Sequence, residues 1–223
     1  MRICFVSRET VRDFSFRATD CSADVIFFGF GGVDGDVSYE RELKGETAYF
    51  EDVALLSKEY KCAVVCACVT DTRGIKRKSA VVAEGGRILG VSDMLNSVDG
   101  EYNPGAGLKT YDIKAGKIGV VVGEDIYFPE LLRTLAVCGS EVLFCPFSQT
   151  DGVENILLRA AAFSYGVPCA LCGEGYASVA DIDGSLAFSS PSSPVTFDLE
   201  QKKEYRLIET RRRGFYKKEK RDY

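Results

Sequence analysis

The sequence predicts an α/β fold in which two mixed β-sheets face each other with helices on both outer sides, an α-β-β-α sandwich. Three observations lead to this prediction. Apolar, β-branched runs alternate with amphipathic helical patterns, antiparallel hairpins interrupt the alternation in the middle and at the end, and 46% of the 223 residues are hydrophobic. That content is sufficient for one sizeable core. We expect a single domain over residues 1–210 and a basic tail at residues 211–223.

The first half of the chain begins as alternating strands and helices and then changes to hairpins. Residues 46–60 carry apolar side chains near helical spacing with acidic residues in the first turn, which is typical of an amphipathic helix. Glycine turns separate two short strands in the middle of the chain. We expect at most a short helix within residues 10–20, and strands at 2–6, 24–30, 63–70, 79–83 and 88–91.

A long loop and a strand-to-helix elbow follow. Residues 94–107 have the composition of a loop, and a loop of this length is uncommon in a compact domain unless it serves a purpose such as covering a pocket. After strands at 108–113 and 117–122, Gly123-Glu124-Asp125 turns the chain into a helix that begins at Pro129. Such elbows hold side chains rigidly at the carboxyl edge of an α/β sheet.

The last third returns to strands. We expect a strand at 141–145, then a helix that Asp151 can cap and that stops at Gly166. Only strand-like segments follow, at 168–172, 176–182, 185–189, 195–199 and 205–209. The serine-rich segment at 189–194 reads as a turn cluster and not as a nucleophile elbow.

Charge and composition bear on location and partners. Residues 201–223 hold ten Lys and Arg against four Asp and Glu, so the tail is basic although the whole chain has a net charge of −5. The tail could bind nucleic acid, but we favour contact with its own domain or with a symmetry mate, because it lacks a recognisable nucleic-acid module. No apolar run is long enough to span a membrane, no signal peptide is evident, and most of the nine cysteines lie in apolar strands. We therefore expect a cytoplasmic protein in a reducing compartment.

The chain contains no histidine, which excludes several kinds of chemistry. Ser-His-Asp and Cys-His catalysis and His-ligated metals are ruled out, so Cys, Lys, Glu, Asp or Tyr must carry any reaction. The Cys169-x-x-Cys172 pair has no second cysteine pair at a spacing that would complete a zinc site. Cys66 and Cys68 are two residues apart on a strand, so both side chains point to the same face. We expect neither a metal site nor a cofactor.

The elbow and its surroundings carry a family resemblance. The segment GKIGVVVGEDIYFPELLRTLAVCGSEVLFCPF resembles the nucleophile region of the nitrilase, or carbon-nitrogen hydrolase, superfamily, which typically reads Lys-Ile-Gly, an apolar run, Cys-Tyr-Asp, two residues and Phe-Pro-Glu. The segments ADVIFF, KSAVVAEGGRILG, GEYNPGAG and RAAAFSYGVPCAL resemble other motifs of the family in the same order. The resemblance implies the α-β-β-α sandwich, and a homodimer formed through helices near the elbow and the C-terminal segment.

The resemblance also implies a mechanism whose residues are mostly missing here. In the family a Cys thiolate attacks a nitrile, amide or carbamoyl carbon, a Glu acts as base, a Lys stabilises the charged intermediate, and a second Glu supports the site. By alignment these triad positions fall on Gly123 for the nucleophile, Phe30 for the base and Ser92 for the lysine. Only the supporting glutamate is retained, at Glu101.

Two functions follow from this pattern. The first is a catalytically inactive homologue with a ligand-binding, regulatory or assembly role, whose vestigial pocket we expect to include Phe30, Ser92, Glu101, Gly123, Glu124, Asp125, Cys145 and Cys172. The alternative is an active carbon-nitrogen hydrolase for amides or nitriles with a rebuilt site, using Cys145 or Cys172 with Glu101 as base; Glu124 and Lys78 could lie near it. Glu124 and Asp125 could also do acid/base work as a carboxylate pair. We favour structural roles for both cysteines and for Asp125, and we expect Glu124 to be a solvated or paired acid. We also expect Phe30 to fill part of the cavity.

Overall fold

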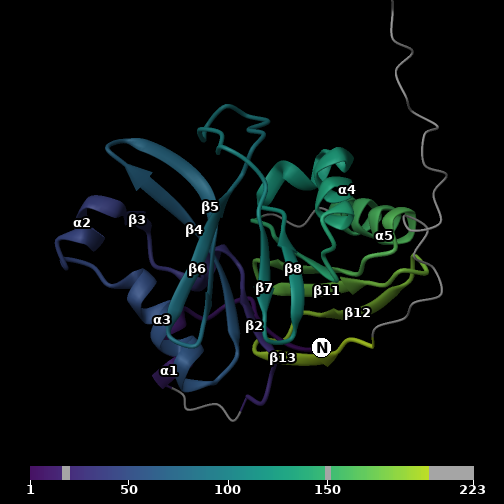
Figure 1. Ribbon diagram of the computed structural model, residues 1–223, viewed down its shortest axis with the longest axis horizontal. Coiled ribbons are helices and arrows are strands. Elements are labelled where there is room, and N and C mark those ends of the chain that lie inside the picture. The colour runs from purple at the N-terminus through teal and green to yellow at the C-terminus, as the bar shows by residue number, and fades with distance from the viewer. Residues whose placement is uncertain (17–20, 149–151, 201–223) are drawn as a thin grey trace, which may run out of the picture.

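The computed structural model describes residues 1–16, 21–148 and 152–200, and these form two β-sheets with helices on their outer sides. Figure 1 shows α1, α2 and α3 beside one sheet and α4 and α5 beside the other. The two mixed sheets and outer helices confirm the predicted α-β-β-α sandwich.

The first sheet has seven strands in the order β13-β1-β2-β4-β5-β6, with β3 beside β4. Strands β1, β2 and β4 run parallel, whereas β5, β6 and β13 join as antiparallel neighbours. The strands are β1 (Arg2–Val6), β2 (Val25–Phe28), β3 (Asp36–Ser38), β4 (Ala63–Thr72), β5 (Ile75–Glu84), β6 (Arg87–Asp93) and β13 (Val195–Asp198).

The second sheet has six strands in the order β12-β11-β10-β9-β8-β7. Its centre, β8, β9 and β10, is parallel, and the outer pairs are antiparallel. The strands are β7 (Thr110–Ile113), β8 (Gly116–Val120), β9 (Val142–Pro146), β10 (Cys169–Gly173), β11 (Tyr176–Ala180) and β12 (Leu186–Ser190). The first sheet therefore presents the carboxyl ends of four parallel strands, since β3 also runs parallel to β4, and the second sheet presents those of three. Carboxyl ends of parallel strands are where α/β proteins commonly bind ligands.

The helices begin and end where local chemistry predicts. Helix α4 starts with a proline in its first turn, whose ring suits that position, and α5 ends at Gly166, which adopts φ +65°. The α-helices are α1 (Val11–Phe16), α2 (Tyr39–Leu43), α3 (Tyr49–Glu59), α4 (Pro129–Val137) and α5 (Val153–Tyr165), and two 3₁₀ helices are η1 (Phe30–Gly32) and η2 (Gly123–Tyr127). No helix in the described ranges is both long and apolar enough to cross a membrane.

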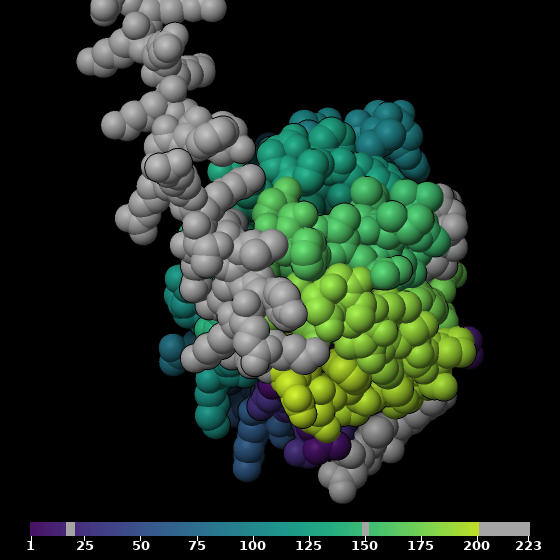
Figure 2. Space-filling model, turned by 90° about the vertical axis from the view of Figure 1, so that its right-hand side faces the viewer, coloured from purple at the N-terminus to yellow at the C-terminus, as the bar shows by residue number. Residues whose placement is uncertain are grey.

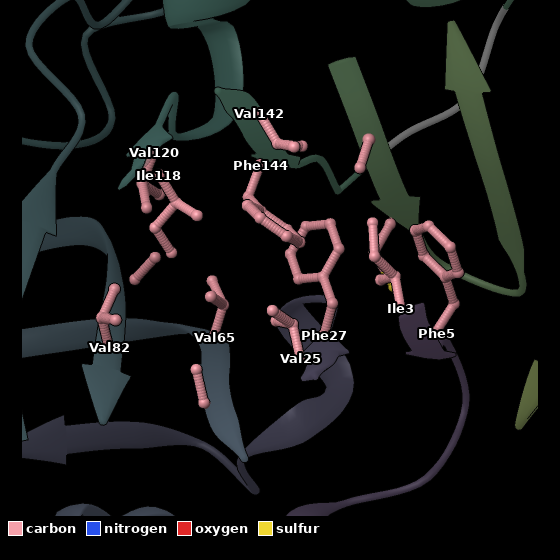
Figure 3. Packing of buried hydrophobic residues seen from close by; sticks show 14 of the residues in the cluster. Ile3, Phe5, Val25, Phe27, Val65, Val82, Ile118, Val120, Val142 and Phe144 are labelled. Carbon is pink, nitrogen blue, oxygen red and sulfur yellow. The ribbon is translucent and has the colours of Figure 1, made fainter. Parts of the chain in front are cut away.

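The core has three layers because strand side chains alternate between faces. Ile3 and Phe5 of β1 point between the sheets, whereas Cys4 and Val6 point toward α1 and α3. In Figure 3 Phe27 and Phe144 approach each other from opposite sheets, with ring centroids 5.1 Å apart in an edge-to-face arrangement. A further cluster lies under α4 and α5, which occupy one side of the molecule together with the later strands (Figure 2).

Most predicted elements are present, with shifts at their ends. The hairpin strands β5 and β6 are longer than predicted, and residues 94–107 form no helix or strand. The sequence reading missed β3 and α2, which are short and follow a glycine-rich turn. The predicted strand at 205–209, the tail at 211–223 and the cap residue Asp151 lie outside the described residues.

Candidate functional site

The predicted elbow is present between β8 and α4, and its apex residue is Gly123. Gly123 has φ +55°, a left-handed conformation that glycine adopts without strain. A Cβ atom built there would lie 3.1 Å from Sδ of Met94 and 3.3 Å from Cδ of Lys78. A side chain at this position would therefore project toward Lys78, but Gly123 has no group that can react.

Lys78 and Glu124 form an ion pair beside the elbow. Nζ of Lys78, on β5, lies 2.5 Å from Oε1 of Glu124, which follows Gly123 directly. Only 10% of the Lys78 side chain and 16% of the Glu124 side chain are exposed, so the pair is largely shielded from water. Lys78 Nζ also lies 4.9 Å from the ring centroid of Tyr102, a cation–π contact. The second carboxylate oxygen of Glu124, Oε2, is buried and accepts no hydrogen bond from any described residue.

A cavity of about 360 Å³ opens at this ion pair. Its polar lining includes the Lys78 ammonium and three carboxylates, from Asp99, Glu101 and Glu124. The remaining lining residues are Phe30, Val69, Tyr102, Tyr127, Phe147 and Ser148. The cavity can therefore receive hydrogen-bond donors on its acidic side, and Lys78, with three N–H donors, can supply at least one to a carbonyl oxygen.

The structure brings together only part of the predicted pocket. Phe30, Glu101 and Glu124 line the cavity, and Phe30 is partly buried against the core between the sheets. Phe30 thus forms a wall of the cavity. Gly123 is not among the lining residues, and Lys78, which we expected only near the pocket, contributes the cation.

Ser92, where the family's lysine was expected, points elsewhere. It is buried on β6, and its hydroxyl shares a 2.8 Å hydrogen bond with the Tyr111 hydroxyl. Burial raises the pKa of Tyr111, with the Ser92 hydrogen bond acting in the opposite direction. Ser92 is not among the residues that line the cavity at Lys78.

Asp125 attaches the elbow to the long loop. Oδ2 accepts from the Leu95 backbone N–H at 2.7 Å, and Oδ1 accepts from the backbone N–H and side-chain amide of Asn96 at 2.9 and 3.0 Å. Burial raises the pKa of Asp125 despite these hydrogen bonds, which act to lower it. All three donors belong to the loop, which agrees with the structural role that we favoured for Asp125.

Neither candidate cysteine lines the cavity. Cys145 lies in the cluster under α4 and α5, with its Sγ 3.9 Å from the Leu143 carbonyl oxygen, and Cys172 lies between the sheets, 3.7 Å from the Val6 carbonyl oxygen. Burial raises the pKa of Cys145 well above its usual range and that of Cys172 to about 12. The structure therefore does not bring either thiol to Glu101. Within the described ranges, no group of three or more His, Cys, Asp or Glu is arranged to hold a metal ion.

Several lining residues were missed by the sequence reading. Asp99 and Tyr102 belong to the loop that we expected to cover a pocket. The sequence indicated the loop but did not indicate that these two side chains line the cavity. Phe147 and Ser148 follow β9 at the carboxyl edge of the sheet. The rule that ligands bind at this edge could have indicated them.

Comparison with known proteins shows the family to which this chain is related. A family profile described as "Carbon-nitrogen hydrolase" matches residues 12–195. The chain is 42% identical to N-carbamoylputrescine amidase of Solanum tuberosum over 60 residues, which are 24% of this chain and 20% of that protein. It is 36% identical to citrullinase of Francisella tularensis over 75 residues, 30% of this chain and 26% of that protein. These matches thus span only a fifth to a quarter of the curated relatives' length.

Solved structures share the fold at low sequence identity. A mutant of the Nesterenkonia AN1 amidase from the nitrilase superfamily superposes with a TM-score of 0.73 at 16% identity, covering 88% of each chain. Saccharomyces cerevisiae Nit3, a member of branch 10 of the nitrilase superfamily, gives a TM-score of 0.74 at 15% identity and covers 97% of this chain and 95% of its own. Another structure of the Nesterenkonia amidase is described as showing acrylamide added at the active site cysteine. Because the family profile spans most of the chain, this chain belongs to the carbon-nitrogen hydrolase family.

Proposed function

We propose that the cavity beside Gly123 binds a small molecule with a terminal carbamoyl or amide group, and that the chain does not cleave it by the thiol mechanism of its family. The observation that carries this proposal is the shielded Lys78–Glu124 pair with its unused carboxylate oxygen, directly after a glycine at the elbow apex. Regulation or assembly with a partner protein would then depend on this ligand.

The chemistry of the cavity matches such a group. A carbamoyl or amide group offers N–H donors and one carbonyl acceptor. The cavity is lined by Glu124, whose buried Oε2 has no hydrogen-bond partner among the described residues, and by Lys78, which has N–H donors. Filling an unsatisfied buried acceptor is favourable because an unpaired polar atom costs about 1–3 kcal/mol. The names of two relatives refer to N-carbamoylputrescine and citrulline, which both end in a carbamoyl group.

Isothermal titration calorimetry with N-carbamoylputrescine tests the binding. We expect measurable binding by the unmodified protein and a loss of about tenfold or more for Glu124→Gln, which replaces the acceptor carboxylate. Glu130→Gln, an exposed glutamate on α4, is the matched control and should leave the affinity unchanged. Equal affinities for all three proteins would contradict the proposed site, and thermal unfolding verifies that each variant is folded.

A second candidate is hydrolysis at the same pair, in keeping with the family and with the names of the relatives. In this version Glu124 accepts a proton from a water molecule that attacks the carbonyl carbon, and Lys78 donates a hydrogen bond to the oxyanion. The C–N bond then breaks as the proton passes to the leaving nitrogen. The position of Lys78 next to the elbow favours this candidate.

Product release separates the two candidates. If the protein hydrolyses the ligand, ammonium or free amine accumulates in proportion to enzyme concentration, and Lys78→Met abolishes the release. Binding without product over many hours supports the first candidate. A third possibility, a relocated Cys145 or Cys172 with Glu101, requires one of these thiols to be reactive.

A further inference from the structure

A second cavity shares part of its wall with the first. It has a volume of about 490 Å³ and shares Phe30, Phe147 and Ser148 with the cavity at Lys78. Its remaining wall includes Ser7 and Arg8 after β1, and Glu174 and Gly175 after β10. The carboxyl ends of parallel strands from both sheets thus border two adjoining cavities.

The second cavity has a buried hydroxyl with no partner. Ser7 is 4% exposed, and its backbone is occupied: its N–H donates to Oγ of Ser193 at 3.0 Å, and its carbonyl accepts from the Gly175 N–H at 3.0 Å. Its Oγ makes no hydrogen bond with any described residue. The backbone bonds hold Ser7 in place, and its buried hydroxyl is an unpaired polar group in a residue that lines the cavity.

Two opposite charges border this cavity. Arg8 and Glu174 are both exposed, and Arg8 forms no ion pair with another described residue. The Arg8 guanidinium lies close to the Gly175 backbone, with Nε 3.4 Å and Nη2 3.7 Å from where a Cβ on Gly175 would be. Gly175 adopts φ +71°, so glycine suits the backbone here and also leaves room for the guanidinium.

We propose that the two cavities together bind an α-amino acid whose side chain ends in a carbamoyl or amide group. The ligand's α-carboxylate pairs with Arg8 and accepts from the Ser7 hydroxyl, and its α-ammonium faces Glu174. Its side chain passes Phe30, and its terminal group reaches Glu124 and Lys78. This inference rests on the proposed function for the terminal group, and it adds the α-amino acid portion.

The charges favour this ligand over a simple amine. A planar guanidinium can bind a carboxylate through two parallel hydrogen bonds, and such charge-assisted bonds are roughly twice as strong as neutral ones. The first cavity has three carboxylates against one ammonium and would repel a carboxylate. The ligand's α-carboxylate is therefore directed to Arg8, which fixes the orientation of the ligand.

Citrulline and N-carbamoylputrescine form a matched pair for the test, because they differ only in the α-carboxylate. Calorimetry should show citrulline binding about tenfold or more tightly than N-carbamoylputrescine to the unmodified protein. Arg8→Ala should remove this advantage and leave the affinity for N-carbamoylputrescine unchanged. Ser7→Ala should weaken citrulline alone by a smaller factor, and Arg133→Ala, an exposed arginine on α4, should change neither.

The outcomes distinguish this inference from the proposed function. If both compounds bind with equal affinity and Arg8→Ala alters neither, the amino-acid subsite is refuted while the carbamoyl site stands. If neither compound binds, the proposed function and the inference that depends on it are both overturned. A loss of both ligands in a folded Arg8→Ala protein would also contradict the inference, since it would show that Arg8 does not act through the carboxylate.

Discussion

At the scale of single residues, the elbow has its expected backbone geometry at Gly123 but no reactive side chain there. The left-handed backbone and the approach of Lys78 are both present where a side chain would project, yet the residue is glycine. Beside the apex, Lys78 and Glu124 form an ion pair with Nζ and Oε1 2.5 Å apart. The apex therefore offers no nucleophile, and the hydrolysis that we give as the second candidate would have to use this pair.

Thiol labelling tests whether a cysteine has taken over the reaction. With a pKa of about 12, only on the order of one Cys172 thiol in 10⁴ is ionised at pH 8, and burial also raises the pKa of Cys145 well above its usual range. We expect iodoacetamide to modify Cys138, which is exposed, at least about 100-fold faster than either. Peptide mass mapping of the native protein measures this, with denatured protein as the control. If Cys145 or Cys172 in the native protein is labelled as fast as Cys138, the result would support the alternative in which that cysteine is the nucleophile of a hydrolase.

Asp125→Asn tests the structural role of the elbow aspartate. The carboxylate accepts three hydrogen bonds, whereas an asparagine must turn an NH₂ group toward some of the same donors. We expect a loss of about 2–4 kcal/mol in the free energy of unfolding, measured by urea denaturation at pH 7. A loss below the error of the method would show that the loop does not depend on these bonds.

The same variant should change the pH dependence in a defined direction. Because folding raises the pKa of Asp125, the native state holds this proton more tightly than the unfolded chain does. Proton binding by Asp125 therefore stabilises the native state fully at a pH below the pKa that Asp125 has in the unfolded chain. This stabilisation is lost as the pH rises through the pKa that Asp125 has in the folded protein. Asp125→Asn lacks this contribution, so its deficit should be larger at acidic pH than at pH 7. A deficit that shrinks on acidification would contradict this sign.

At the scale of elements, close packing between β8, β9 and α4 positions the elbow. Gly119 of β8 lies so close to its neighbours that an added Cβ would sit 2.8 Å from Leu143 Cδ2, 2.8 Å from Ser140 Oγ and 3.2 Å from Leu135 Cβ. These contacts are too short for a methyl group. The strand can therefore approach the helix only with glycine here, and the elbow directly follows this strand.

Gly119→Ala tests this packing. We expect overpacking to lower the free energy of unfolding by about 1–3 kcal/mol. Gly107→Ala is the control, since a Cβ there meets no atom within 4 Å, and it should be neutral or slightly stabilising. Equal effects of the two substitutions in urea denaturation would show that the close approach at Gly119 is relieved cheaply.

At the scale of the whole molecule, aromatic contacts join the two sheets. Phe27 of β2 and Phe144 of β9 are fully buried and meet edge to face (Figure 3). We expect Phe27→Ala and Phe144→Ala each to cost about 3–5 kcal/mol, with a coupling of about 0.5–1.5 kcal/mol in a double-mutant cycle. Phe16→Ala, at a side chain that is 86% exposed, should change stability by less than about 0.5 kcal/mol. Additive effects at Phe27 and Phe144 would argue against a direct contact between the sheets.

The homodimer is a prediction that belongs to the same scale. Helices α4 and α5 carry exposed apolar side chains, among them Val137, Val153, Ile156 and Phe163, and the family resemblance places the partner near these helices. If the chain is a dimer through this face, Ile156→Glu should yield a monomer in light scattering. Leu43→Glu, at another exposed apolar side chain, on α2, should remain dimeric. If light scattering shows that the unmodified protein is a monomer, the homodimer prediction is contradicted.

The sequence by itself determined the layers and the elbow, because these depend on local patterns. Period-two burial, glycine and proline at turns and helix ends, and the order of family motifs can all be read along the chain. They indicated the two mixed sheets, helix α4 and the absence of a thiol at Gly123. The same patterns missed β3 and α2, which are too short to show a period.

Only the tertiary structure decided which side chains meet. Lys78 and Glu124 are 46 positions apart, and Ser7 and Gly175 come from opposite sheets, so no local pattern connects them. Strand register also directed Ser92 toward Tyr111 and both candidate cysteines into apolar clusters away from the cavity. A binding site is a set of long-range contacts, and such contacts are determined by how the sheets and loops pack together.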